Sequence, residues 1–275
     1  FPQSMQGHLL VGNVIGDQGI LQYKISEKDS SYSGQELEPL LLSSDPNFRP
    51  VDMKMGPDGA LWFIDWHNAI IGHLQHHLRD PSRDQTHGRV YRVTYESNAL
   101  ATPAKIADEP IDKLLDNLKS KIERDRYRTR IELGSCKTEE VVPAIKRWVE
   151  NLDSKDADYE HHLLEALWIT KNHNSLDRAL LNRVLGSPEP RARAAATRVL
   201  SNWRDKVPDA LDILKRLAGD PFPRVRLEAV RAASFFPVPE AIEVVLISTQ
   251  YTSDIYMDHL RREVMRELDP IWKRA

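Results

Sequence analysis

Cysteine is almost absent from the 275-residue sequence, which contains only Cys136. One cysteine cannot form a disulfide within the chain, and it cannot supply the clusters that hold structural zinc or a c-type haem. Long apolar runs are also absent, so no segment is predicted to cross a bilayer as a helix. The formal net charge is only -3 and charges of both signs are interleaved, which gives no indication of nucleic-acid binding.

The first residues lack the usual features of a native N-terminus. The chain begins Phe1-Pro2-Gln3, without a methionine, a charged leader or the apolar segment of a signal peptide. We therefore expect the chain to be a piece of a longer protein. Its composition, with 41% hydrophobic and 29% charged residues, is typical of globular proteins, and its length is sufficient for two domains.

Residues 1–98 are predicted to be rich in β-strand. Six short runs, at residues 8–14, 20–25, 37–42, 51–55, 60–66 and 88–95, are bounded by turn residues. The segment Gly56-Pro57-Asp58-Gly59 predicts a tight hairpin turn, because proline presets one backbone angle and glycine permits a positive φ. The polar, serine-rich residues between the second and third runs predict a loop.

Strands that arrive in threes with short turns predict a meander, such as a blade of a β-propeller. The first two runs are expected to be middle strands of one blade, with 37–42 as its outer strand, and residues 51–95 would supply three strands of the next blade. Two blades cannot close a ring. The exposed strand edges are therefore expected to need upstream residues or a partner chain.

Residues 99–110 predict a linker, and residues 111–275 are predicted to be helical. Residues 187–198 align without gaps to residues 220–231, with both prolines, three arginines and an alanine in common. Shorter matches join Leu164-Glu165-Ala166 to Leu227-Glu228-Ala229, and Arg126-Tyr127-Arg128 to Arg224-Val225-Arg226. These matches predict about four helix pairs of roughly 30 to 40 residues each. The sequence motif Asp-Pro-x-Pro-Arg-Val-Arg, which begins at Asp220, resembles the HEAT-repeat family of α-solenoids, whose units stack into one continuous body.

Six arginines of these repeats are expected to bond acidic neighbours between repeats, with a groove for a partner as the alternative. They are Arg191, Arg193, Arg198, Arg224, Arg226 and Arg231.

The long charged loop between residues 65 and 89 is the main candidate for a functional site, because long loops in compact sheets often carry function. It holds five histidines, which suit proton transfer or metal binding near neutral pH. Three of these, His73, His76 and His77, would share one side of a helical turn. The alternative is a buried polar network in which Arg79 and Arg83 pair with nearby aspartates and keep the loop rigid. The spacing matches no usual zinc signature.

Other residues of chemical interest have ordinary structural explanations. Trp62 and Trp66 share one face of a predicted strand and are expected to pack in the core or between blades. His161, His162 and His173 are expected at solvated helix positions. Cys136 precedes a predicted helix, whose N-terminus could lower the thiol pKa. No matching histidine and asparagine pattern supports a nucleophile, so a half-buried thiol is the alternative.

A family resemblance rests on short sequence motifs within residues 47–95. The segments that carry it are Phe48-Arg49-Pro50-Val51-Asp52, Gly56-Pro57-Asp58-Gly59-Ala60-Leu61, Asp65-Trp66, Ile71-Gly72-His73, Gln75-His76, Arg79-Asp80-Pro81, Arg83-Asp84 and Thr86-His87-Gly88-Arg89. Together they resemble the end of the propeller in large bacterial proteins called putative membrane-bound dehydrogenases. These proteins are relatives of the glucose and sorbosone dehydrogenases that use pyrroloquinoline quinone, and in them HEAT-like repeats follow the propeller.

The resemblance implies a periplasmic or membrane-associated bacterial protein that oxidises a sugar-like substrate. It implies that pyrroloquinoline quinone and calcium are bound mainly by residues outside this chain. It also implies a haem c on a downstream domain or on a partner cytochrome. In this chain the expected catalytic residues are His73, His76, Arg79 and His87, and the expected cofactor-binding residues are Asp65, Asn68 and Arg83.

Two functions are therefore expected. The first is the C-terminal part of a partial β-propeller of the quinoprotein sugar dehydrogenase type, followed by a HEAT-like solenoid that docks to partners. The second is a non-catalytic scaffold or interaction subunit of a periplasmic or membrane-attached assembly.

Overall fold

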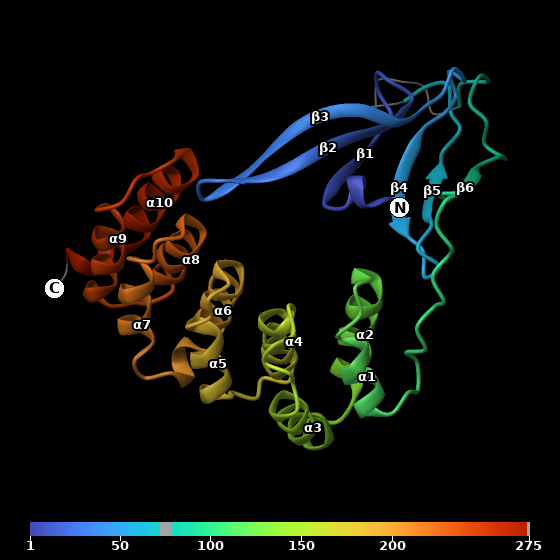
Figure 1. The fold of residues 1–275 in the computed structure, drawn as a ribbon. Coiled ribbons are helices and arrows are strands. Elements are labelled where there is room, and N and C mark those ends of the chain that lie inside the picture. The colour runs from blue at the N-terminus through green and yellow to red at the C-terminus, as the bar shows by residue number, and fades with distance from the viewer. Residues whose placement is uncertain (72–78, 274–275) are drawn as a thin grey trace. The chain divides into compact units, whose positions relative to one another are not determined.

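The computed structural model describes residues 1–71 and 79–273 and divides the chain into two units. The sheet unit comprises Phe1–Ser26 and Tyr32–Lys105, and the helical unit comprises Glu27–Ser31 and Ile106–Ala275. Figure 1 shows strands in the first and helices in the second. None of the described helices is long and apolar enough to span a membrane.

The sheet unit contains two antiparallel three-stranded sheets. They are formed by β1 (His8–Asn13), β2 (Gly19–Lys28) and β3 (Ser31–Leu42), and by β4 (Pro50–Met55), β5 (Leu61–Asp65) and β6 (Arg89–Val93). A short 3-10 helix, η1 (Gln3–Met5), precedes them. The β-rich start is therefore confirmed. The described residues form two small open sheets, with no closed barrel or propeller.

Two details differ from the sequence prediction. Residues 26–36, predicted as a loop, instead continue β2 and β3 into a long hairpin with Asp29 in the left-handed conformation (φ 52°). These residues carry no alternating apolar pattern, so backbone pairing forms the strands without a signal in side-chain hydrophobicity. In addition, β1 lies at an edge of its described sheet, whereas a middle position was expected.

The core of the sheet unit lies on one face of β5. Leu61 and Phe63 are buried there, whereas Trp62 and Ile64 point to the opposite, exposed face. The ring of Phe63 stacks on Tyr91, with the ring centroids 5.0 Å apart. The predicted turn between β4 and β5 is confirmed, because the amide of Gly56 donates to the carbonyl of Ala60 (2.7 Å) and Gly59 has a positive φ (77°).

The two sheets contact each other through β1 and β4. Gly12 on β1 lies against Pro50 on β4, and a Cβ at Gly12 would collide with the carbonyl oxygen of Pro50. The absence of a side chain at this position therefore allows the first strands of the two meanders to run close together.

The helical unit is built from ten described α-helices and two 3-10 helices. They are α1 (Ile111–Asn117), α2 (Glu123–Ser135), α3 (Thr138–Glu150), α4 (Tyr159–Asn172), α5 (Arg178–Leu185), α6 (Pro190–Asn202), η2 (Arg204–Lys206), α7 (Ala210–Leu217), α8 (Pro223–Ala233), η3 (Pro239–Ala241), α9 (Ile242–Ser248) and α10 (Ile255–Trp272). The helical character predicted for this region is confirmed.

These helices form two layers. The even-numbered helices pack on one another in sequence and form the inner layer, and the odd-numbered helices form the outer layer of the arc seen in Figure 1. One apolar cluster runs from Leu114 in α1 to Val244 in α9, and a second, from Val230 to Leu268, continues it into α10. Each helix therefore buries its apolar side against its neighbours, as in a stacked repeat.

The repeats share one contact at the start of α2, α6 and α8. The side chain of a Ser or Asp accepts a hydrogen bond from the backbone amide two residues later in the chain. The backbone carbonyl of the same residue accepts a hydrogen bond from the guanidinium of an arginine six residues later. The three pairs are Ser120 with Arg126 (2.6 Å), Ser187 with Arg193 (2.8 Å) and Asp220 with Arg226 (2.8 Å). Arg126 is therefore the structural equivalent of Arg226, two positions away from the match made in the sequence.

Candidate functional site

The candidate site in the sheet unit is the loop that joins β5 to β6, residues 66–88. Its first residues are held by Asp65, whose side chain is fully buried at the end of β5. Oδ1 of Asp65 accepts the backbone amides of Arg49 (2.7 Å) and His67 (2.8 Å). His67 has a positive φ (47°), a conformation that is uncommon without glycine and is kept here by this carboxylate.

The next three residues of the loop are held by further contacts to their backbone. The buried side chain of Asn68 accepts the amide of Ile70 (3.4 Å), and its backbone amide donates to the carbonyl of Asn47 (2.9 Å). Arg83 donates to the carbonyl of Ile70 (3.0 Å), and the buried Arg49 donates to the carbonyl of Ala69 (3.4 Å). Asp65, Asn68 and Arg83 therefore each hold backbone groups at the base of the loop.

Arg89, the first residue of β6, links the two sides of this base. Its Nη1 lies 3.1 Å from Oδ2 of Asp45 and 3.7 Å from Oδ2 of Asp65. Its Nη2 lies 3.1 Å from Nε2 of His67, and because a guanidinium only donates, this ring nitrogen must accept. The amide of Asn47 and the guanidinium of Arg89 hold the pKa of Asp45 below its usual range.

The far part of the loop is organised around Asp84. Its carboxylate accepts the amide (2.9 Å) and hydroxyl (3.0 Å) of Thr86 and the amide of His87 (3.0 Å), and it lies 2.9 Å from Nδ1 of the His87 ring. The hydrogen bonds from Thr86 and His87 hold the pKa of Asp84 well below its usual range. His87 itself is largely exposed, so its imidazole is accessible and oriented by the carboxylate.

The other predicted site residues have different positions. Arg79 is exposed at the start of the described second half of the loop and takes part in contacts there. His73, His76 and the neighbouring His77 lie outside the described residues, so their shared helical turn stays a prediction.

Sequence reasoning gave no separate role to Asp45, Arg49 and Arg89, although they hold the base of the loop. The available signal was the placement of Asp65 and Arg89 at the facing ends of neighbouring strands, where the register pairs them. Within residues 1–71 and 79–273, no group of three or more His, Cys, Asp or Glu side chains is placed to bind a metal ion.

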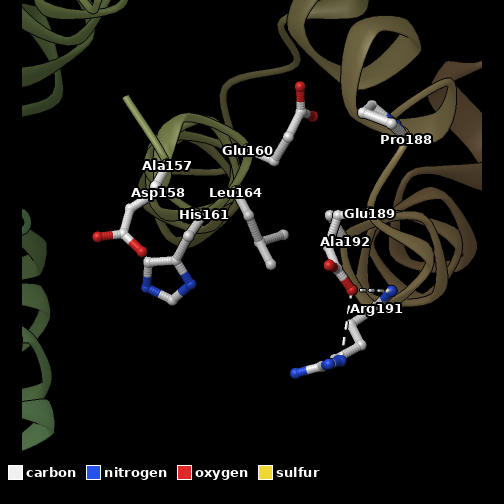
Figure 2. A pocket seen from close by; sticks show the side chains of 9 residues that line it. All are labelled: Ala157, Asp158, Glu160, His161, Leu164, Pro188, Glu189, Arg191 and Ala192. Carbon is white, nitrogen blue, oxygen red and sulfur yellow. Dashed lines mark hydrogen bonds and ion pairs between the residues drawn. The ribbon is translucent and has the colours of Figure 1, made fainter. Parts of the chain in front are cut away.

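A second candidate site is a hollow of about 520 Å³ in the helical unit. Figure 2 shows Asp158, His161 and Leu164 on its α4 side, and Glu189 and Arg191 on its α6 side.

Behind this hollow, the fully buried Glu165 lies 3.1 Å from Nε2 of His161 and 2.8 Å from Nη1 of Arg130. Burial raises the pKa of Glu165, but His161 and Arg130 outweigh burial and the net effect lowers that pKa. The glutamate is therefore kept ionised, and the imidazole is directed by a buried carboxylate.

The solvated position predicted for His162 is wrong, whereas His173 is half-buried. His162 is buried, with its ring centroid 6.2 Å from that of Trp148, and burial lowers the pKa of its imidazole. The ring of His173 lies between the hydroxyl of Thr138 (3.0 Å) and the carbonyl of Leu133 (2.9 Å). Both rings contact neighbouring helices, because Trp148 and Thr138 belong to α3 and Leu133 belongs to α2.

Cys136 is half-buried, and its thiol donates to the carbonyl of Glu132 (3.4 Å). Burial, followed by the charges of Glu132 and Glu140, raises the pKa of the thiol. The lowered thiol pKa considered from its place before a helix is therefore wrong, and the half-buried thiol expected as the alternative is found.

The arginines of the repeats bond acidic neighbours, as expected, in two clear cases. Arg193 forms a bidentate pair with Asp220 of the next repeat (2.8 and 2.9 Å), and Arg198 pairs with the buried Glu228. Arg226 instead donates to backbone carbonyls, and burial lowers the pKa of its guanidinium. Arg193 and Arg198 therefore link neighbouring repeats, whereas Arg231 pairs with Glu228 of its own helix and Arg191 pairs with the adjacent Glu189.

Comparisons with known families match two separate parts of the chain. Residues 1–97 match a family described as "Domain of unknown function (DUF7133)", and residues 178–257 match the family described as "HEAT repeats". The second match confirms the HEAT prediction for that segment. No curated protein matches the chain.

Proposed function

We propose that this chain is an interaction scaffold in which the helical unit recognises a protein partner. The observation that carries this proposal is the character of the inner layer. Equivalent positions of α2, α4, α6 and α8 carry basic residues or large side chains there. One row, in the first turn, contains Arg124, His161, Arg191 and Arg224. A second row, two turns later, contains Ile131, Trp168, Arg198 and Arg231.

The inner layer is suited to contact because it combines exposed aromatic residues with arginine, the residue types that are enriched at protein interfaces. Tyr127 on α2 and Phe235 after α8 are about half exposed. The guanidinium of Arg231 lies 5.6 Å from the ring of Phe235, which keeps both groups extended at the surface.

The sheet unit is proposed to be two neighbouring blades of a propeller. This is supported by the order of strands in the two meanders and by the contact between their first strands, β1 and β4. Ile64 and Val90 face each other across β5 and β6 on a face that is exposed in this unit. Upstream blades or a partner chain would cover this face and complete the sheets.

The scaffold proposal is tested by photo-crosslinking the full-length protein in its native cells. A benzophenone amino acid would replace Tyr127 or Phe235 on the inner layer, and Leu246 on α9 of the outer layer would be the matched control. The proposal expects the same crosslinked protein from both inner positions and none from Leu246. Crosslinks from Leu246 alone, or from no position, would contradict it.

A second candidate function is a contribution to a quinoprotein sugar dehydrogenase, with a c-type cytochrome as electron acceptor and a periplasmic location. It is favoured by the long loop of residues 66–88, whose base is rigidly held and whose His87 is accessible and oriented by Asp84. The loop, whose sequence includes Arg79, His73 and His76, would face the substrate or the cofactor.

The described residues by themselves do not fit calcium. The carboxylates of Asp45 and Asp65 both face the guanidinium of Arg89, and Oδ1 of Asp65 accepts two backbone amides. Calcium instead prefers six to eight oxygen ligands. Binding of pyrroloquinoline quinone would likewise need residues outside this chain, because Arg89 is already paired with carboxylates.

The second candidate is tested with full-length protein supplied with quinone and calcium, by following dye reduction with a series of aldoses. This function expects sugar-dependent reduction that falls at least tenfold in His76→Ala and Arg79→Ala, in the range of a lost general base or charge-assisted contact. Arg92→Ala, outside the loop, is the control. Absence of sugar-dependent reduction would reject the enzymatic function and leave the scaffold function in place.

A further inference from the structure

A groove on the inner layer of the helical unit lies between α4 and α6 and has a volume of about 370 Å³. Its lining residues are Arg130 from α2, Trp168, Lys171 and Asn172 from α4, and Ala195, Arg198, Val199 and Asn202 from α6. These lining residues include three cations, two carboxamides and one large aromatic ring, and no carboxylate. The groove is therefore cationic and rich in hydrogen-bonding groups.

The two carboxamides occupy equivalent positions in neighbouring repeats. Asn172 and Asn202 are the last residues of α4 and α6, and both are exposed. Asn202 donates one hydrogen to the carbonyl of Arg198 (2.9 Å), which leaves its Oδ1 and second hydrogen for another partner. A carboxamide offers one acceptor and two donors, so it can bind both the N–H and the C=O of a peptide chain.

The spacing of the repeats suits an extended peptide. Packed helices lie about 8–10 Å apart, and an extended chain advances about 3.3 Å per residue, so neighbouring carboxamides match peptide groups about three residues apart. Such a chain would cross α4 and α6 at their C-terminal ends.

The remaining groups of the groove define the side chains that it would accept. Trp168 precedes Asn172 by one helical turn, and the guanidinium of Arg130 lies 5.6 Å from its ring. Arg198 stands one turn before Asn202. Arg130 and Arg198 each bond a buried glutamate, whereas Lys171 has no ion-pair partner within the part of the chain that the structure describes. An aliphatic stem could pack on the Trp168 ring, and carboxylates would be attracted to Lys171 and Arg198.

We propose that this groove binds an extended acidic peptide segment of a partner protein. Asn172 and Asn202 bind its main chain, Trp168 packs against one of its side chains, and Lys171 and Arg198 face its carboxylates. This inference rests on the scaffold function proposed above and deepens it by naming the chemistry of the partner.

The test measures fluorescence anisotropy of labelled 12-residue peptides with the 275-residue chain. The probe alternates glutamate with serine, and two matched peptides carry lysine or alanine in place of glutamate. The proposal expects the glutamate peptide to bind at least tenfold more tightly than either, and to weaken as salt rises from 50 to 500 mM, because exposed charges are screened.

Substitutions then assign the binding to the groove. Asn172→Ala combined with Asn202→Ala is expected to weaken binding about tenfold, which corresponds to the loss of one or two hydrogen bonds. Lys171→Gln is expected to weaken it about threefold and to flatten its dependence on salt. These residues are half-buried or exposed, so their variants should fold normally. The controls are Asn182→Ala on α5 and Arg216→Gln on α7, in the outer layer, which should leave binding unchanged.

Several outcomes would overturn the proposal. Equal binding of the lysine peptide, or binding unaffected by the groove variants, would reject the acidic-peptide assignment. Groove-dependent binding of the alanine peptide would reject the acidic specificity and leave the scaffold function intact. Tighter groove-dependent binding of a 12-nucleotide single strand would identify nucleic acid as the occupant instead. No peptide binding, together with no crosslinks from Tyr127 or Phe235, would reject both proposals.

Discussion

The two units of this chain are stabilised by different kinds of contact. In the helical unit, apolar side chains form clusters that extend through successive helices, from Leu114 to Leu268. In the sheet unit the fully buried apolar cluster is small, centred on Ile20, Phe48 and Phe63, and a network of charged side chains holds the long loop. Large apolar side chains such as Ile64 and Val90 stay exposed on one of its sheets. The helical unit thus has a continuous apolar core between its two layers, whereas the sheet unit has a small core and leaves Ile64 and Val90 exposed on one face.

The largest expected effect is in the core of the helical unit. Leu167→Ala should lower the free energy of unfolding by about 3–5 kcal/mol, because Leu167 is fully buried in α4 and its neighbours on both layers limit collapse of the cavity. Denaturant unfolding followed by circular dichroism at 222 nm measures this loss. Leu246→Ala, at an exposed position of α9, should change stability by less than about 0.5 kcal/mol, and equal losses in both variants would contradict the two-layer packing.

A buried charge of the same unit should show the next largest effect. Glu165→Gln should cost roughly 3 kcal/mol at neutral pH, because Arg126, Arg130 and His161 lose the carboxylate that they surround. The folded pKa of Glu165 is lowered, so its stabilising contribution is present above the unfolded value of 4.5 and is lost as pH falls through the folded pKa. The loss of stability of the wild type below pH 4.5 should therefore be shallower in Glu165→Gln. Identical acid-unfolding curves would contradict this account.

A smaller effect is expected at the base of the loop in the sheet unit. Asp65→Ala should destabilise this unit by about 2 kcal/mol, because the amides of Arg49 and His67 lose their shared acceptor. Asp65→Asn keeps an oxygen at this place and should recover about half of that loss. Hydrogen exchange followed by mass spectrometry reports on this unit through the backbone amides of β5, Leu61–Asp65. No loss in Asp65→Ala would show that the carboxylate does not hold the loop.

The smallest expected effect concerns the exposed sheet face. Ile64→Thr should change the stability of this 275-residue chain by less than about 0.5 kcal/mol, because the side chain is about half exposed. In a longer chain that includes the upstream residues, the same substitution should cost at least about 1 kcal/mol if a blade covers this face. Thermal unfolding of both chains, with and without the substitution, measures the difference. An equal, small effect in both would show that the face stays open.

Much of the strand and helix content could be predicted from the sequence. The Gly56-Pro57-Asp58-Gly59 turn depends on local backbone preference and is found where it was predicted. Trp62 and Trp66, expected in the core or between blades, are instead partly exposed in the described residues, because the opposite face of β5, with Leu61 and Phe63, forms the core. The HEAT repeats were visible because proline and arginine recur at fixed positions from residue 187 to residue 231. The long hairpin near Asp29 was missed, because polar strands paired through their backbones leave no hydrophobic period to detect.

The candidate site was less predictable than the fold. The loop and its concentration of histidines are properties of the sequence, but the roles of Asp45, Arg49 and Arg89 depend on strands that are brought together by pairing. Similarly, nothing local distinguishes His162 from His161, yet one ring is buried and the other faces a hollow. The difference arises from which side of α4 meets the neighbouring helices.

The sequence by itself determined that the chain passes from short strands to helical repeats. Turn residues, apolar periodicity and repeated proline–arginine motifs are local patterns that can be read without knowledge of the tertiary structure. Only the tertiary structure decided which charges are buried, which histidines are exposed, and which residues of successive repeats line a common groove. Those properties depend on contacts between residues about 30 positions apart, such as Arg198 and Glu228, and such contacts form only when the helices stack.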